Sequence, residues 1–220
     1  MATTYSSGNK TKEKIIKATR ILLYKKGFSN TTYDDISNAT KINRALIPYH
    51  FKSKQQLGQI IYSQIITDFF SSLDSILDVK EFSADFVSTL HITAYYQLLT
   101  DSSFVQFVNE LQNDISFSSF MEQSEYELME GLIQKSNKLS PTEKSILLTS
   151  AVGMKKELIR MVNNKKADVN DIAKMQLYML LSYCGYSKKK IEELYDSAMQ
   201  VIHMFTFQIT SDFRIDILYK

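Results

Sequence analysis

Apolar residues recur along this chain with the three- and four-residue spacing of amphipathic helices, whereas alternating apolar and polar stretches are scarce. Over about residues 11–26, for example, Ile15, Leu22 and Leu23 share one helical face, and residues 1–9 ahead of them are expected to fray. Only six Gly and two Pro interrupt the 220 residues. The pattern therefore predicts an all-α chain with short connections.

Capping residues set the ends of several predicted helices. Thr32 stands before Asp34 and Asp35, whose charges suit the positive end of a helix, and Ser53 begins a long helix. Residues 140–143 read Ser-Pro-Thr-Glu, the pattern of a capping box with proline in the first turn. The final segment partly alternates, which leaves a strand-like or irregular end open. From Ser53 onward, helices are predicted at about residues 53–77, 82–99, 101–113, 117–137, 140–163, 168–185 and 187–210.

Charge is divided unevenly along the chain, although the net charge is only +2. Residues 1–55 hold 11 Lys and Arg against 3 Asp and Glu, giving +8, and residues 56–220 hold 15 against 21, giving −6. A basic segment beside an acidic remainder indicates that the former binds a polyanion. A solvated basic face would have the same composition, so charge alone does not decide.

Several features predict a cytoplasmic protein. The first residues lack the apolar run of a signal peptide, and no stretch approaches the roughly 18 consecutive apolar residues of a membrane span. The single cysteine, Cys184, excludes an internal disulfide and suits a reducing compartment.

Residues 32–57 are predicted to form two short helices joined by a tight turn, followed by the start of a third. In the first short helix Ile36 and Ala39 face inward, and the second runs from Asn43 to about Tyr49. A helix of this length fits the major groove of DNA, where its N-terminal residues meet base edges. The stretch therefore predicts a helix-turn-helix.

The exposed positions of this unit are the candidates for DNA contact. Arg44 carries the fork that matches the paired acceptors of guanine, and Leu46 suits a thymine methyl group. Contact of Arg44 with phosphate, a capping role for His50 and partial burial of Tyr49 remain alternatives. Phosphate contacts are expected from Thr32, Lys41, Tyr49, His50 and Lys54.

The order of a basic first helix, Gly-Phe, Thr-Thr, an acidic second helix and then the run Tyr49 to Leu57 (YHFKSKQQL) resembles the TetR/AcrR family of transcriptional regulators. The resemblance covers about residues 11–57. It implies an N-terminal three-helix DNA-binding domain, residues 1–52, and a helical effector-binding and dimerisation domain, residues 53–220. The DNA-binding residues are then Thr32, Lys41, Asn43, Arg44, Ala45, Leu46, Tyr49, His50 and Lys54.

Two positions depart from the family pattern. Lys41 occupies a turn position that is often glycine, so a residue with a side chain is expected to adopt φ > 0 there. Pro48 stands where an aromatic residue is common and removes a backbone donor near the expected end of the second helix.

The resemblance further implies a homodimer that pairs through the helices at about 169–185 and 187–210 and binds a palindromic DNA site. Their apolar stripes would look the same if they only buried the helices within one chain. The body is also expected to hold a small-molecule effector between its middle helices. The candidate lining residues, each of which could equally be ordinary core, are Tyr95, Tyr96, Phe104, Phe107, Asn109, Tyr126, Met129 and Met154.

No enzyme motif occurs in the sequence. The three histidines, His50, His91 and His203, are far apart, and the chain has no HExxH, CxxC or phosphate-binding glycine loop. We therefore expect no catalytic residues, no metal and no cofactor. The expected function is a ligand-responsive transcriptional repressor released from its operator by a small molecule. The alternatives are a basic protein that binds nucleic acid without sequence preference, and a helical interaction protein that does not bind DNA.

Overall fold

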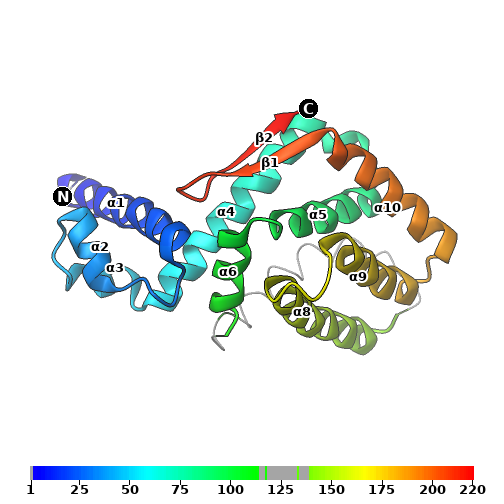
Figure 1. Ribbon diagram of the computed structural model, residues 1–220, viewed down its shortest axis with the longest axis horizontal. Coiled ribbons are helices and arrows are strands. Elements are labelled where there is room, and N and C mark those ends of the chain that lie inside the picture. Colours follow the sequence, from blue (N-terminus) through cyan, green and yellow to red (C-terminus); the bar gives the residue numbers. More distant parts are fainter. Residues whose placement is uncertain (1, 114–116, 118–132, 134–138) are drawn as a thin grey trace.

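The computed structural model describes residues 2–113, 117, 133 and 139–220. We call residues 2–52 the head and residues 53–220 the body, following the boundary predicted from the sequence. The head comprises α1 (Ala2–Lys26), α2 (Tyr33–Thr40) and α3 (Leu46–Phe51), which lie at one end of the elongated molecule (Figure 1). Its small core is formed by buried Ile15, Leu23, Ile36, Ile47 and Phe51.

The body is built around a buried helix, α5 (Ala84–Leu98), which packs against its neighbours α9 and α10. Nearly every residue of α5 from Ser88 to Leu98 is buried, as expected for a helix that is covered on all sides. The other helices of the body in the described part of the chain are α4 (Lys54–Leu77), the 3₁₀ turn Val79–Glu81, α6 (Ser102–Leu111), α8 (Pro141–Asn163), α9 (Val169–Tyr183) and α10 (Lys188–His203).

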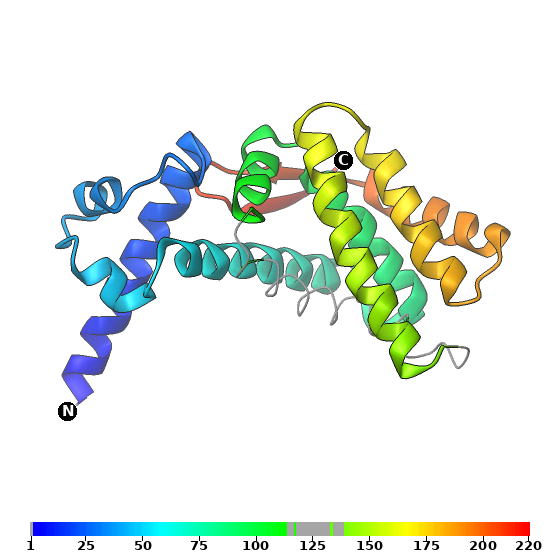
Figure 2. The same cartoon turned by 90° about the horizontal axis from the view of Figure 1, so that it is seen from below.

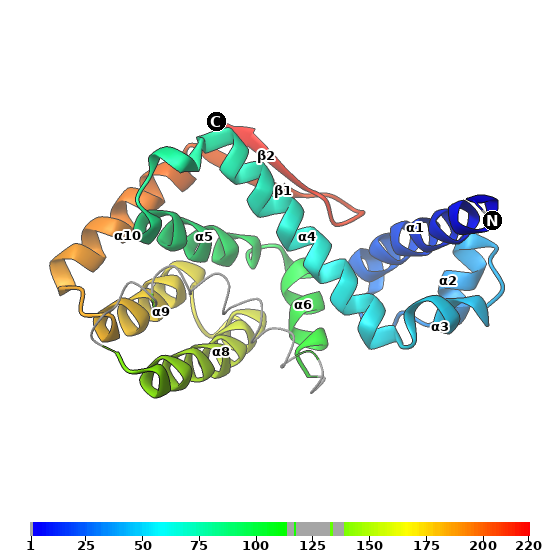
Figure 3. The ribbon, with the colours of Figure 1, turned by 180° about the vertical axis from the view of Figure 1, so that it is seen from behind.

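The chain ends in an antiparallel hairpin of β1 (Phe205–Ile209) and β2 (Ile215–Tyr219). This hairpin runs alongside α4 with its turn directed toward α1, as the front and back views both show (Figures 1 and 3). Phe207 of β1 packs edge-on against Phe69 of α4, with ring centroids 5.1 Å apart. The described residues are otherwise helical or irregular, so the expected all-α fold is confirmed with one small sheet added.

The hairpin turn reaches the head. Phe213 in this turn is fully buried, and its ring packs against Tyr24 of α1 and against Phe104 and Phe107 of α6. Arg20 of α1 donates hydrogen bonds from Nε to the carbonyl of Asp212, at 3.0 Å, and from Nη2 to that of Phe213, at 2.8 Å. Seen from below, the C-terminal end of α1 meets both the hairpin and α6 (Figure 2). The C-terminus therefore ties the head to the body.

Several predicted boundaries were right because local capping determines them. Thr32 forms a capping box with Asp35, and Ser140 forms another with Glu143. Ser53 caps α4 by accepting a hydrogen bond from the amide of Gln56 at 3.0 Å. The helix expected at 117–137 lies outside the described residues, apart from positions 117 and 133.

Other predicted boundaries were wrong. The first helix starts at Ala2 rather than near Thr11. Residues 2–10, although polar, contain no proline that would interrupt the hydrogen bonds of the helix backbone. The last helix ends at His203 rather than near Thr210, because the alternating residues that follow it pair as the hairpin. Ala39 is exposed, and Thr40, one i to i+4 step after Ile36, is the buried residue instead.

Candidate nucleic-acid interface

The turn between α2 and α3 is fixed by its own hydrogen bonds. The amide of Lys41 donates to the carbonyl of Ser37 at 2.8 Å, and the Ser37 hydroxyl donates to the carbonyl of Ile42, also at 2.8 Å. Lys41 adopts φ 58°, as expected for the position that is often glycine in the family. A residue with a side chain costs about 1 kcal/mol in this left-handed region, so the turn is held by its surroundings rather than by local preference.

The second helix of the pair begins later than predicted, at Leu46 rather than Asn43. The Asn43 side chain accepts a hydrogen bond from the amide of Ala45 at 2.9 Å, and the amide of Leu46 donates to the Asn43 carbonyl, also at 2.9 Å. These bonds close a tight turn before the helix. Pro48 consequently lies in the first turn of α3, where its missing N–H would have no helical partner, so the expected loss of a bond does not occur.

The two faces of α3 differ sharply in exposure. Ile47 and Phe51 are buried in the head, whereas Leu46 is 43% exposed and Tyr49 is 78% exposed. His50 is half-buried between the rings of Tyr49 and Phe51, with centroids 5.3 and 6.3 Å away. The outward face therefore presents an apolar and an aromatic side chain that the fold itself does not use.

The remaining predicted contact residues of this face lie in the preceding turn. Lys41, Asn43, Arg44 and Ala45 are all exposed. The Arg44 guanidinium pairs with Asp34 of α2, its Nη1 lying 3.0 and 3.1 Å from the two carboxylate oxygens. These four residues, Leu46 and Tyr49 are thus exposed side chains of one short segment of the head.

Two of the residues predicted to contact phosphate, Thr32 and Lys54, make hydrogen bonds within the fold. The Thr32 hydroxyl donates to the Asp35 carboxylate at 2.6 Å and accepts from the Asp35 amide at 3.2 Å. The Lys54 ammonium donates to the carbonyls of Phe28, Ser29 and Thr31 at 3.0, 3.3 and 3.1 Å. Burial lowers the pKa of Lys54, and its three protons hold the loop before α2 against the start of α4.

Asp35 carries more of the local structure than its sequence position suggested. Its carboxylate lies 2.6 Å from the ammonium of Lys26 and accepts a 2.7 Å hydrogen bond from the Thr32 amide. These partners, the lysine foremost, hold the pKa of Asp35 well below its ordinary value. The Thr32-to-Asp35 spacing was the available signal, because a capping box needs an acceptor at the third helical position.

A second set of residues joins the loop before α2 to the body, and sequence reasoning missed it. The Glu110 carboxylate of α6 accepts a 2.7 Å hydrogen bond from the amide of Ser29. Phe28 packs over Gly58 of α4, where a Cβ atom would lie 2.8 Å from the ring and 2.9 Å from Leu111. The loop is therefore held between α4 and α6. The Gly27-Phe28 pair was the only signal for this contact in the sequence.

Six of the eight residues predicted to line an effector site lie in the part of the chain that the structure describes. Tyr95, Tyr96, Phe104 and Phe107 are buried core side chains, Met154 is half-buried on α8, and Tyr126 and Met129 lie outside the described residues. The Tyr95 ring lies against the ammonium of buried Lys155, 3.7 Å from its centroid, and the Tyr96 hydroxyl bonds to Gln176.

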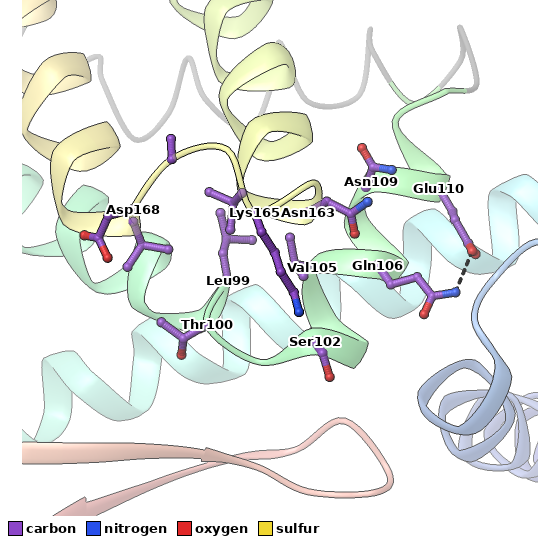
Figure 4. Close-up of a pocket in the computed structure, with 13 residues that line it drawn as sticks. Leu99, Thr100, Ser102, Val105, Gln106, Asn109, Glu110, Asn163, Lys165 and Asp168 are labelled. Carbon is purple, nitrogen blue, oxygen red and sulfur yellow. Dashed lines mark hydrogen bonds between the residues drawn. The ribbon is translucent and has the colours of Figure 1, made fainter.

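A cleft of about 820 Å³ opens beside α6, and of the predicted effector residues Asn109 lines it (Figure 4). Lys165 extends along this cleft, and Gln106 and Glu110 point toward each other at its end near the head, bonded at 2.8 Å. The cleft is lined by Leu99, Thr100, Ser102, Val105, Gln106, Asn109, Glu110, Val162, Asn163, Lys165, Ala167, Asp168 and Val169.

No helix in the described part of the chain is long and apolar enough to cross a membrane.

Comparison with known proteins gives matches for the head and for the fold. Residues 15–59 match the model for bacterial regulatory proteins of the tetR family. IcaR, the negative transcriptional regulator of the biofilm operon icaADBC in Staphylococcus aureus strain Newman, is 33% identical over 93 residues, 42% of this chain and 46% of IcaR. An uncharacterised HTH-type regulator of Lactococcus lactis is 44% identical over 46 residues, 21% of this chain and 24% of that protein. The match thus spans less than half of these relatives.

Solved structures show that the whole fold is shared. RolR in complex with resorcinol superimposes with a TM-score of 0.66 at 17% identity, over 87% of this chain and 95% of RolR. A TetR-family regulator from Pectobacterium atrosepticum superimposes with a TM-score of 0.53 at 16% identity, over 78% of this chain and 90% of that one. At these identities the likeness establishes the architecture of head and body.

Proposed function

We propose that this chain is a member of the tetR family of bacterial regulatory proteins, whose model residues 15–59 match, and that it binds a specific palindromic DNA site as a homodimer and represses transcription until a small molecule releases it. The observation that carries the proposal is the outward face of α3. Tyr49 is 78% exposed and Leu46 is 43% exposed, while Ile47 between them is fully buried. A rigidly packed short helix with large unused side chains is suited to insertion into the major groove.

Charge supports DNA as the partner of this face. The head lies in the segment with a charge of +8, and the body carries the opposite sign. Such a division attracts the head to phosphate and keeps the body away from it. A protein that used only this charge would bind every duplex alike, whereas a regulator is expected to prefer its own site by at least about 10³-fold.

Selection from a random duplex pool, followed by fluorescence anisotropy on the enriched and a scrambled sequence, tests sequence specificity. We expect enrichment of an inverted repeat. Arg44→Ala should weaken binding to it by roughly 1–3 kcal/mol and relax the preference at one base pair. The matched control is Lys156→Ala, an exposed cation on α8, which should leave affinity unchanged. If no sequence is enriched, the chain either binds nucleic acid without sequence preference or does not bind DNA.

Dimerisation is supported by an apolar stripe on α9. Met175, Met179 and Tyr183 recur at every fourth position, and Met175 and Tyr183 are 62% and 64% exposed. Exposed apolar residues that recur on one helical face are typical of an interface with another chain. Met175→Glu together with Tyr183→Glu should convert a dimer to a monomer in analytical ultracentrifugation. A species of unchanged mass would place the interface elsewhere.

We place the effector in the cleft beside α6 because two of its lining residues also bear on the head. Gln106 and Glu110 are bonded to each other, and Glu110 accepts the hydrogen bond of Ser29 in the loop before α2. A ligand that bonds to either side chain competes with this contact. Its binding would thus favour a different position of the head, as a ligand that shifts an equilibrium must.

A panel of small polar molecules, scored by their ability to lower the affinity for the selected duplex, tests this placement. Asn163→Ala should weaken the response to any active molecule, since Asn163 lines the cleft. Met154→Ala should keep the response, because Met154 does not line this cleft. It is one of the residues that the sequence analysis expected around an effector between the middle helices. The reverse result would place the effector in the interior.

A further inference from the structure

The ion pair between Asp34 and Arg44 has a feature that a solvated surface pair does not need. It spans ten residues, from the first turn of α2 to the turn before α3, and both carboxylate oxygens contact the same nitrogen, Nη1, at 3.0 and 3.1 Å. Both oxygens of the carboxylate thus bind the same nitrogen of the guanidinium. Both side chains are exposed, and Arg44 is one of the residues that we propose to contact DNA.

The contact leaves the other edge of the guanidinium available. A guanidinium has five N–H donors in a planar fork, and recognition of guanine uses two parallel donors at once. In the part of the chain that the structure describes, neither Nε nor Nη2 of Arg44 donates a hydrogen bond. Holding Nη1 therefore restrains the guanidinium and leaves the Nε–Nη2 edge able to bind a base.

Both ends of the pair are anchored in the backbone. Asp34 lies in the turn fixed by the Thr32–Asp35 capping box, and Arg44 follows Asn43, whose side chain closes the turn before α3. A long flexible side chain loses less conformational freedom on binding when it is already ordered. An unpaired carboxylate at this place would only repel phosphate.

From this geometry we propose that Asp34 is a positioning residue for base recognition by Arg44 and so determines specificity, although it contacts no base itself. The proposal rests on the proposed function, because it needs Arg44 to face DNA. It makes a prediction that charge alone does not. Removing the carboxylate should improve binding to any duplex through lower repulsion, and at the same time should degrade discrimination between duplexes.

The test compares the wild type with Asp34→Ala and Asp34→Asn on three duplexes: the selected sequence, the same sequence with the base pair read by Arg44 changed, and a scrambled sequence. We expect affinity for the scrambled duplex to rise a few-fold. The ratio of affinities for the selected and changed duplexes should fall about tenfold for alanine, and in the same direction for asparagine. Thermal unfolding of both variants confirms that they are folded.

Two further variants isolate the cause. In an Arg44→Ala background, Asp34→Ala should change all three affinities by one common factor, because there is no longer a guanidinium to position. Glu13→Ala, which removes an exposed carboxylate on α1, should raise all three affinities alike and leave their ratios unchanged.

The outcomes separate the possible roles of Asp34. An equal rise on all duplexes would overturn the proposal and make Asp34 a solvated charge. A larger rise for the selected duplex than for the scrambled one would also overturn it, since Asp34 would then compete with DNA for Arg44. If the wild type showed no preference among the three duplexes, the proposed function itself would fail, which is a distinct result.

Discussion

Replacing Phe213 by alanine would test how strongly the C-terminal hairpin holds the head to the body. The ring is fully buried and lies 5.3 Å from the ring of Tyr24, 6.2 Å from that of Phe104 and 5.3 Å from that of Phe107, measured between centroids. It therefore fills the space between α1 of the head and α6 of the body. Alanine would remove the ring and leave a cavity where these helices meet the hairpin.

The expected loss is about 3–4 kcal/mol in the free energy of unfolding. Truncation of a buried phenylalanine to alanine typically costs about 3–5 kcal/mol, a range that already includes the lost contacts with neighbouring rings. The site lies at the edge of the core beside a hairpin turn that can partly collapse, which favours the lower end. Phe213→Leu keeps most of the apolar volume and should cost about 1.5 kcal/mol or less.

Phe213 also adopts φ 54°, so the backbone makes its own contribution. Alanine is strained there much as phenylalanine is, whereas glycine is not. Glycine gains additional freedom in the unfolded chain, which offsets part of that relief. Phe213→Gly should therefore be at least as destabilising as Phe213→Leu and within about 1 kcal/mol of Phe213→Ala.

Urea unfolding at one fixed protein concentration, followed by circular dichroism, measures these differences, since a dimer's apparent stability depends on concentration. Hydrogen exchange should locate the loss in the C-terminal half of α1 and in the hairpin. A decrease of less than about 1 kcal/mol in the free energy of unfolding of the alanine variant would refute the reasoning, because removal of a well-packed ring costs more than this. Loss confined to the hairpin would show that the head is held by other contacts.

Three further changes test individual contacts. Lys54→Met should cost about 2 kcal/mol because it leaves loop carbonyls without a charged donor, whereas exposed Lys52→Met should stay within about 0.5 kcal/mol in the same urea assay. Asp35 has a lowered pKa, so its contribution to stability is present above its ordinary value of 3.8 and is lost as pH falls toward its folded-state pKa; the difference in melting temperature between wild type and Asp35→Asn should therefore shrink on acidification. Gly58→Ala should destabilise by about 1–3 kcal/mol through overpacking, while Gly153→Ala, with nothing within 4 Å of its added Cβ, should stabilise α8 by about 0.5–1 kcal/mol. Equal effects within either matched pair would contradict the contacts described above.

The features that the sequence predicted well depend on neighbours in the chain. Thr32, Ser53 and Ser140 begin their helices because the amide that each one caps lies two or three residues ahead. The αL conformation of Lys41 follows from its place in the turn. The burial of Ile36 and Ile47 follows from helical periodicity. The same periodicity, with a three-residue step from Ile36, predicted that Ala39 is buried, whereas the buried residue is Thr40, four residues from Ile36.

The features that the sequence did not predict depend on segments distant in the chain. Lys54 resembled a phosphate contact because it is basic and near the DNA-binding helices, but carbonyls more than twenty residues away take its protons. Phe104 and Phe107, two aromatic residues expected around an effector, pack against the ring of Phe213, which lies more than a hundred positions later in the chain. Neither relation has a local signature.

Two sets of long-range contacts between the head and the body meet on α6. Glu110 near its C-terminal end bonds to the loop before α2, and Phe104 and Phe107 carry Phe213, which in turn is bound through the hairpin to Arg20 of α1. The head is thus connected to α6 on two sides, once directly and once through the C-terminus. A displacement of α6 must either carry α1 with it or break both connections, because packed cores switch between discrete arrangements rather than deform smoothly. Under the proposed function, a ligand in the cleft that Glu110 lines would act on the head through these two connections, against the bonds that Lys54 of α4 makes to the loop before α2.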